Sequence, residues 1–127
     1  MSWLGADPAP RTLGDALALT PDLRAGYRAL QAALAAEPSL DPGLRARCRA
    51  RVAMLLGVAA DGATTPDDVV MEFVEQLVLD AHGMSDDLMA RLAGVLSPRA
   101  IVTLAQAVVV WEGQYRIARC LDVAPEC

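Results

Sequence analysis

Four polar residues that stand directly before a proline constrain this fold more than any other feature of the sequence. Proline is favoured in the first turn of an α-helix, because its fixed backbone angle suits that turn and its missing amide is not needed there. Ser, Thr and Asp are preferred just before a helix, since their side chains accept hydrogen bonds from unpaired backbone amides. The sequence therefore predicts helix starts at Thr20-Pro21, Asp41-Pro42, Thr65-Pro66 and Ser97-Pro98.

Apolar residues and further caps extend this helical pattern over most of the chain. The segment after Pro21 carries an apolar stripe at helical spacing, formed by Leu23, Tyr27, Leu30 and Leu34. Thr12 and Asp15 are spaced as a capping box, and no segment alternates with the period of a strand. We expect an all-α fold of about six helices, over residues 13–19, 21–36, 42–58, 66–82, 85–96 and 98–121.

Length and composition predict one domain that associates with copies of itself. We expect a loose arm over residues 1–12, one domain over 13–123 and a tail over 124–127. Apolar residues make up 54% of the 127, more than one small core readily covers, so we expect a dimer, trimer or hexamer. No apolar run approaches the ~18 residues of a membrane helix, so no membrane partner is expected.

Charge and cysteine content exclude several function classes. A net charge of −5 argues against nonspecific nucleic-acid binding, and the first residues do not resemble a secretory signal, so we expect a cytoplasmic protein. Cys48, Cys120 and Cys127 form no close pair and are expected to be thiols. His82 is the only histidine, which excludes zinc sites built on two histidines, and we expect no metal and no cofactor.

The third predicted helix shows why one of these thiols is expected to be structural. Its apolar stripe consists of Leu44, Cys48, Val52 and Leu55, and its arginines lie on the flanks. A cysteine on such a stripe is more often a small core residue than a nucleophile.

The fourth predicted helix carries the first candidate site. Polar residues and Leu79 step along one face by four, three, four and three positions: Asp68, Glu72, Glu75, Leu79 and His82. A histidine near a carboxylate is a plausible acid/base pair, which makes Glu75 and His82 the catalytic candidates. Alternatively, the acids form a solvated face and His82 caps the negative end of the helix.

The sixth predicted helix carries the second candidate, a polar and aromatic insertion at Trp111, Glu112, Gly113, Gln114, Tyr115 and Arg116. Glu112 and Arg116 are four residues apart and can form an ion pair, and Gly113 suggests a close approach of a helix or ligand. We expect a small-molecule pocket between the fourth and sixth helices, with Trp111, Glu112, Tyr115 and Arg116 binding the substrate. The alternative is a packing contact held by the ion pair.

The order of several segments resembles the carboxymuconolactone decarboxylase and AhpD-like family. The resemblance covers about residues 20–123 and rests on segments 27–30, 40–45, 49–53, 73–83 and 111–116. It implies an AhpD-like helical bundle. The peroxidases of this family use a Cys-x-x-Cys pair with a glutamate and a histidine, and the corresponding positions here are Val58, Asp61, Ala46 and Thr65.

The missing cysteine pair disfavours an AhpD-like alkylhydroperoxidase, because thiol peroxidases need a thiolate and a resolving partner. The decarboxylase branch works without cofactor or catalytic cysteine. The resemblance therefore implies a cofactor-independent decarboxylase, isomerase or cyclase for a small organic acid or polyketide-like substrate, in which His82 moves a proton, Glu75 orients it and Arg116 holds an anionic group. The alternative is a non-catalytic homo-oligomeric scaffold or ligand-binding protein. The fold alone cannot decide between this alternative and an enzyme.

Overall fold

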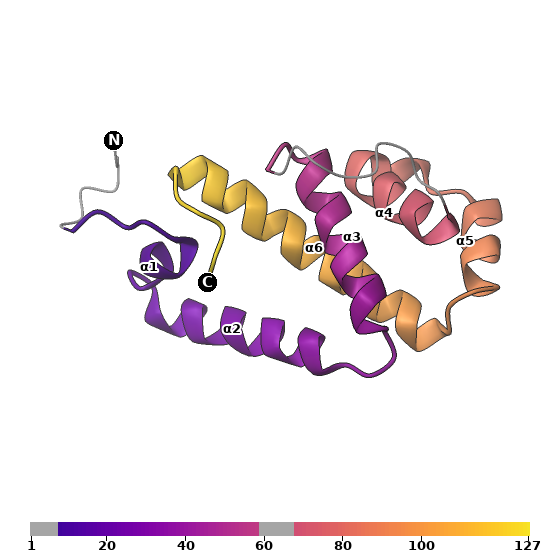
Figure 1. Ribbon diagram of the computed structural model, residues 1–127, viewed down its shortest axis with the longest axis horizontal. Helices are drawn as coiled ribbons and strands as arrows, with labels where there is room; N and C mark the ends of the chain where they lie inside the picture. The colour runs from indigo at the N-terminus through magenta and orange to yellow at the C-terminus, as the bar shows by residue number, and fades with distance from the viewer. Residues whose placement is uncertain (1–7, 59–67) are drawn as a thin grey trace. The chain divides into compact units, whose positions relative to one another are not determined.

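The structure, a computed structural model, describes residues 8–58 and 68–127 and confirms the all-α prediction. The described residues contain no β-strand, only one isolated bridge between Thr12 and Ala124. The described residues form six α-helices, labelled in Figure 1, and one short 3-10 turn: α1 (Leu13–Leu17), α2 (Pro21–Ala36), α3 (Pro42–Leu55), α4 (Val69–Asp80), η1 (Ala81–Gly83), α5 (Asp86–Ala93) and α6 (Pro98–Leu121).

The chain divides into two compact units. The first comprises Met1–Ala36 together with Gly113–Cys127, and the second comprises Glu37–Glu112. Helix α6 contributes its first part to the second unit and its last part to the first. The expectation of one domain over residues 13–123 stays a prediction.

The predicted caps explain where most helices begin. Thr12 and Asp15 form the expected capping box, in which each side chain accepts a hydrogen bond of 3.1 Å from the backbone amide of the other. The side chain of Asp41 accepts from the amide of Leu44 at 3.0 Å and so opens α3. Ser85 caps α5 in the same way, by accepting from Leu88 at 3.1 Å.

Helix α4 is shorter at both ends than the predicted range 66–82. Asp68 has an extended backbone and its side chain accepts from the amide of Met71 at 2.9 Å, so the helix starts at Val69. The predicted start at Thr65-Pro66 lies outside the described residues, as do Asp61 and Gly62. At the other end, the carboxylate of Asp80 accepts from the amide of Gly83 at 3.1 Å and turns the chain into η1.

Gly83, which ends η1, does not have the left-handed backbone that a glycine often has at the end of a helix. Among the described glycines only Gly57, which follows α3, has a positive φ, of 73°. A Cβ at Gly83 would instead clash with the Asp80 carboxylate that caps the turn. Gly83 is therefore suited to its place by close packing and not by its backbone angle.

The core of the second unit is formed by side chains of four helices. In Figure 1, α3 lies alongside α4, and α4 lies beside α5. The fully buried residues of this unit include Cys48 and Val52 of α3, Val74 of α4, Leu92 of α5, and Leu104 and Val108 of α6. Among the described helices, no single one is long and apolar enough to cross a membrane; only α5 and α6 together, across a bend of 120°, have that length and composition.

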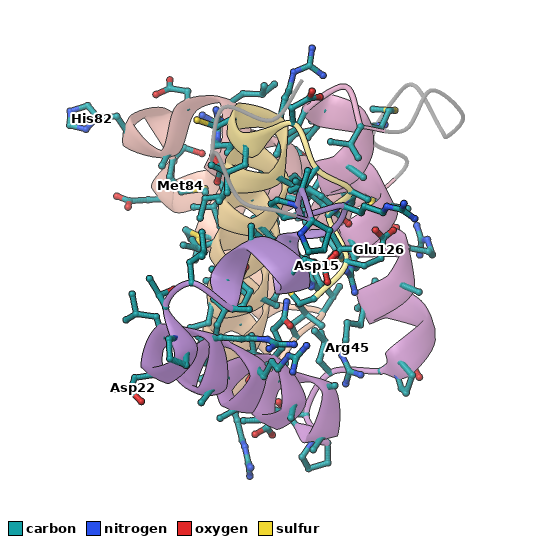
Figure 2. The ribbon with its side chains drawn as sticks, turned by 90° about the vertical axis from the view of Figure 1, so that its left-hand side faces the viewer. Asp15, Asp22, Arg45, His82, Met84 and Glu126 are labelled. Carbon is teal, nitrogen blue, oxygen red and sulfur yellow. The ribbon has the colours of Figure 1, made fainter. Side chains whose placement is uncertain are left out.

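In the first unit, backbone hydrogen bonds connect the C-terminal residues to α1. Leu13 donates its amide hydrogen to the carbonyl of Ala124 at 2.8 Å, and Gly14 donates to Glu126 at 2.9 Å. Figure 2 shows Glu126 beside Asp15 of α1. A Cβ at Gly14 would lie 3.1 Å from the backbone of Cys127, so a glycine at this position lets the two segments pack closely.

Candidate functional site

The polar face predicted for the fourth helix forms three ion pairs within the second unit. Each carboxylate of this face meets an arginine of α3 or α5. The N–O distances are 2.8 Å for Arg47–Asp68, 2.8 Å for Arg91–Glu72 and 2.9 Å for Arg51–Glu75. The face therefore joins α4 to the helices on both sides of it.

The pair between Arg51 and Glu75 is the most buried of the three. The side chain of Arg51 is 4% exposed and that of Glu75 is 22% exposed. The Nη1 atom of Arg51 also lies 3.8 Å from the sulfur of Met54. Glu75, one of the two catalytic candidates, thus binds a guanidinium group that has been removed from water.

Arg51 lies on a flank of the apolar stripe of α3, as predicted for the arginines of this helix, but its side chain is buried. This residue follows Cys48 by three positions and precedes Leu55 by four, which places it at the edge of the apolar stripe. An arginine at such a position needs a carboxylate partner when it is buried. That spacing was the signal in the sequence that could have indicated a buried arginine in need of a carboxylate partner.

The two outer ion pairs keep their carboxylates charged. The hydrogen bond from Arg91 lowers the pKa of Glu72, and this effect outweighs the opposing effect of desolvation. Burial raises the pKa of Asp68, but the Met71 amide and the Arg47 guanidinium together bring it below its ordinary value. Carboxylates in this state are weak proton acceptors, so these two groups are suited to holding helices together rather than to general base catalysis.

His82, the other catalytic candidate, is exposed in the turn η1. Figure 2 shows its ring pointing outward, away from the helices. This position, directly after α4, agrees with the alternative that His82 lies near the negative end of that helix.

The other predicted site residues have different degrees of burial and belong to both units. In the second unit Trp111 is buried and Glu112 is half-buried, while in the first unit Tyr115 is buried and Arg116 is exposed. The pocket between the fourth and sixth helices therefore stays a prediction. At Gly113, an added Cβ would meet nothing within 4 Å, so the described chain supplies no close contact there.

Gln114 is a buried polar residue for which the sequence predicted no role. It is 2% exposed and lies in the first unit. Its amide nitrogen donates to the carbonyl of Pro125 at 2.6 Å, and its amide oxygen accepts from Gln31 of α2 at 2.9 Å. A glutamine can satisfy one donor and one acceptor without a charge, which suits it to this buried joint.

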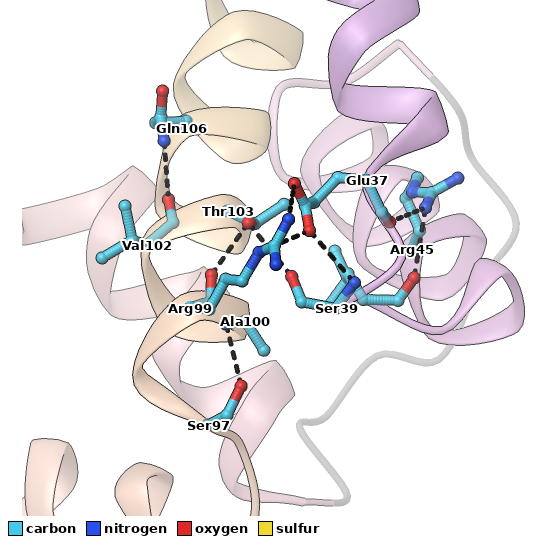
Figure 3. Close-up of polar contacts among 10 residues, drawn as sticks. Glu37, Ser39, Arg45, Ser97, Arg99, Ala100, Val102, Thr103 and Gln106 are labelled. Carbon is cyan, nitrogen blue, oxygen red and sulfur yellow. Dashed lines mark hydrogen bonds and ion pairs between the residues drawn. The ribbon is translucent and has the colours of Figure 1, made fainter.

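A further polar cluster fixes the connection between α2 and α3 to the start of α6, within the second unit (Figure 3). Arg99 binds both oxygens of Glu37, with N–O distances of 2.9 and 3.2 Å. The hydroxyl groups of Ser39 and Thr103 lie 3.3 Å apart, and Arg45 donates to the carbonyls of Glu37 and Leu40. Because these contacts connect the segment between α2 and α3 to the first turns of α6, we interpret the cluster as structural.

Burial of Cys48 is expected to make its thiol unreactive in the folded protein. The side chain is fully buried, and this burial raises the pKa of the thiol from 9.0 to about 12. Near neutral pH its thiolate fraction is then about a thousandfold smaller than that of an ordinary cysteine. In a Cys120→Ser/Cys127→Ser variant, we expect the remaining thiol to react with Ellman's reagent only after unfolding.

The matched control is a Cys48→Ser/Cys127→Ser variant, which retains the exposed Cys120 and should react in the native state. Equal reaction rates of the two native variants would show that Cys48 is accessible.

Comparisons of the chain with protein-family models, with curated proteins and with solved structures found no match. The resemblance to the carboxymuconolactone decarboxylase and AhpD-like family stays a prediction.

Proposed function

We propose that the protein is a non-catalytic helical scaffold that acts by self-association, with α2 as the interface between two copies. The observation that carries this proposal is the exposure of α2. None of its 16 residues is buried, and the side chains of Leu23 and Leu30 are 69% and 41% exposed. Helices in proteins are stabilised mainly by packing of an apolar face, so a helix of this length is expected to be covered in the working assembly.

The exposed face of α2 has the spacing of a helix–helix seam. Leu23, Gly26, Leu30 and Ala33 follow one another at three, four and three positions, and all four are exposed. This is the pattern by which two helices pack side by side. An added Cβ at Gly26 would meet nothing within 4 Å, so the middle of the seam leaves room for the backbone of a second helix.

A second copy of the chain is the partner that suits this seam best. Of the residues that border it, Tyr27, Ala29, Leu34 and Ala36 are uncharged, and the one charged residue, Asp22, lies at its N-terminal end. Two identical faces of this kind meet without repulsion between like charges, and a two-fold axis lets the same patch serve both partners. The surplus of apolar residues in the sequence supports the same conclusion.

The geometry of the two catalytic candidates gives less support to an enzyme. Glu75 binds the buried Arg51, and His82 lies exposed in η1. A general acid/base pair would need both side chains at one substrate. The hypothesis of a cofactor-independent decarboxylase, isomerase or cyclase, with its small-molecule substrate, therefore stays a prediction, as does the cytoplasmic location.

The proposal is tested by the substitution Leu30→Asp, measured by light scattering at micromolar concentration. We expect the wild-type protein to have at least twice the 13.4 kDa mass of one chain. A charge in the middle of an apolar seam should dissociate it, because burial of an unpaired carboxylate is costly. The variant is therefore expected at the monomer mass.

The matched control is Leu79→Asp, which introduces the same charge at a leucine of α4 that is 65% exposed. This variant should keep the wild-type mass. A monomeric wild-type protein, or a Leu30→Asp variant with unchanged mass, would contradict the assignment of the interface to α2.

A further inference from the structure

A hollow in the first unit lies between the N-terminal arm, α1 and the start of α2. Its volume is about 510 Å³, within the range of small-molecule sites. Neither the predicted pocket nor the α2 seam includes its charged residues, which are Arg11, Asp15 and Arg24.

The guanidinium group of Arg24 is the first feature that indicates a ligand. Its Nε atom is buried and has no hydrogen-bond partner among the described residues. A buried charged donor without a partner is costly, and an anion in the hollow would offset part of this cost through its attraction to the guanidinium charge. Arg11 is a second arginine among the residues that line the hollow.

Asp15 limits how much negative charge the hollow accepts. Its carboxylate already accepts hydrogen bonds of 3.1 Å from the amides of Arg11 and Thr12. The bond from the Arg11 amide contributes most to lowering the pKa of Asp15, and the bond from the Thr12 amide contributes second most. The carboxyl group is therefore charged at neutral pH. With two arginines and one aspartate, the wall has one net positive charge, which matches a monoanion better than a dianion.

The rest of the wall is apolar. Pro8, Pro10, Ala18 and Leu19 line the hollow, and the side chain of Leu19 is 61% exposed in this structure. A leucine that faces a concave surface gains free energy when an apolar group covers it. The ligand should therefore carry a hydrocarbon body in addition to its charge.

We propose that this hollow binds a small organic monocarboxylate, with the carboxylate on the guanidinium groups of Arg24 and Arg11 and the hydrocarbon body against Leu19 and the prolines. Guanidinium groups suit carboxylates because their N–H groups match the two oxygens in a planar, bidentate arrangement. The site lies within one chain and does not depend on self-association.

Octanoate is a suitable probe, and 1-octanol, of the same chain length without the charge, is its control ligand. In titration calorimetry at pH 7 we expect octanoate to bind at least tenfold more tightly than 1-octanol. In two-dimensional NMR, octanoate should shift the amide signals of Arg11, Asp15 and Leu19. Arg24→Gln should weaken octanoate binding at least tenfold, because it removes the charge that binds the carboxylate.

Arg119→Gln is the matched control variant, since it removes the same charge from an exposed position of α6 outside the hollow. It should bind octanoate as the wild type does. Leu19→Asn provides a second test at an exposed position, and should weaken octanoate binding several-fold even if Arg24→Gln does not fold. Equal binding of octanoate and 1-octanol, undiminished binding by Arg24→Gln or by Leu19→Asn, or shifts confined to residues 37–112 would each overturn the proposal.

Discussion

Glu75→Ala is expected to lower the free energy of unfolding by about 3–5 kcal/mol, because it leaves the guanidinium group of Arg51 buried without this carboxylate. The Arg51 side chain is 4% exposed, so water cannot easily replace the lost ion pair at 2.9 Å. Chemical denaturation followed by circular dichroism gives this difference directly.

Two further variants separate the buried ion pair from a general effect of removing charge. Glu72→Ala breaks an ion pair whose side chains are 46% and 44% exposed, and it should cost no more than about 1 kcal/mol. The double substitution Arg51→Met/Glu75→Leu removes both charges and should recover most of the stability lost in Glu75→Ala. Similar losses in Glu72→Ala and Glu75→Ala would contradict the buried ion pair.

The helix starts could be predicted from sequence because each depends on a few neighbouring residues. The caps at Thr12, Asp41 and Ser85 act through amides three residues away, so their effect does not require knowledge of the fold. The fourth helix was predicted to start at Thr65-Pro66, which lies outside the described residues, and the described helix is capped by Asp68.

The partners of charged residues could not be predicted in the same way, because they lie on different helices. Arg51 and Glu75 are separated by 24 positions, and Arg91 and Glu72 by 19. Helical periodicity placed Glu72 and Glu75 on one polar face, but it does not state which helices pack on either side of that face. The sequence thus predicted the carboxylates of the candidate site and missed the arginines that bind them.

Gln114 shows the same limit for an uncharged residue. It lies within the polar insertion of the sixth predicted helix, where the sequence pattern predicted roles only for the neighbouring charged and aromatic side chains. Its two partners, Gln31 and Pro125, lie 83 and 11 positions away in the chain. Only the folded structure brings α2 and the C-terminal segment to this amide.

The loss of this amide should have the second large effect on stability. Gln114→Ala removes both hydrogen bonds of a buried amide and leaves the partly buried partner groups of Gln31 and Pro125 without Gln114, which should cost about 2–4 kcal/mol. Because Pro125 belongs to the segment bound to α1, the amides of Leu13 and Gly14 should also exchange hydrogen faster. Denaturation and hydrogen exchange measure these two effects separately.

Gln106→Ala is the matched control, since Gln106 lies on the same helix but is exposed and bonds only to the carbonyl of Val102 at 3.3 Å among the described contacts. Its effect on stability should stay within about 0.5 kcal/mol, as for most surface substitutions. If both variants lost the same stability, the buried amide of Gln114 would contribute no more than a surface glutamine. If Gln114→Ala were destabilised without faster exchange at Leu13 and Gly14, the amide would stabilise α6 and not the C-terminal segment.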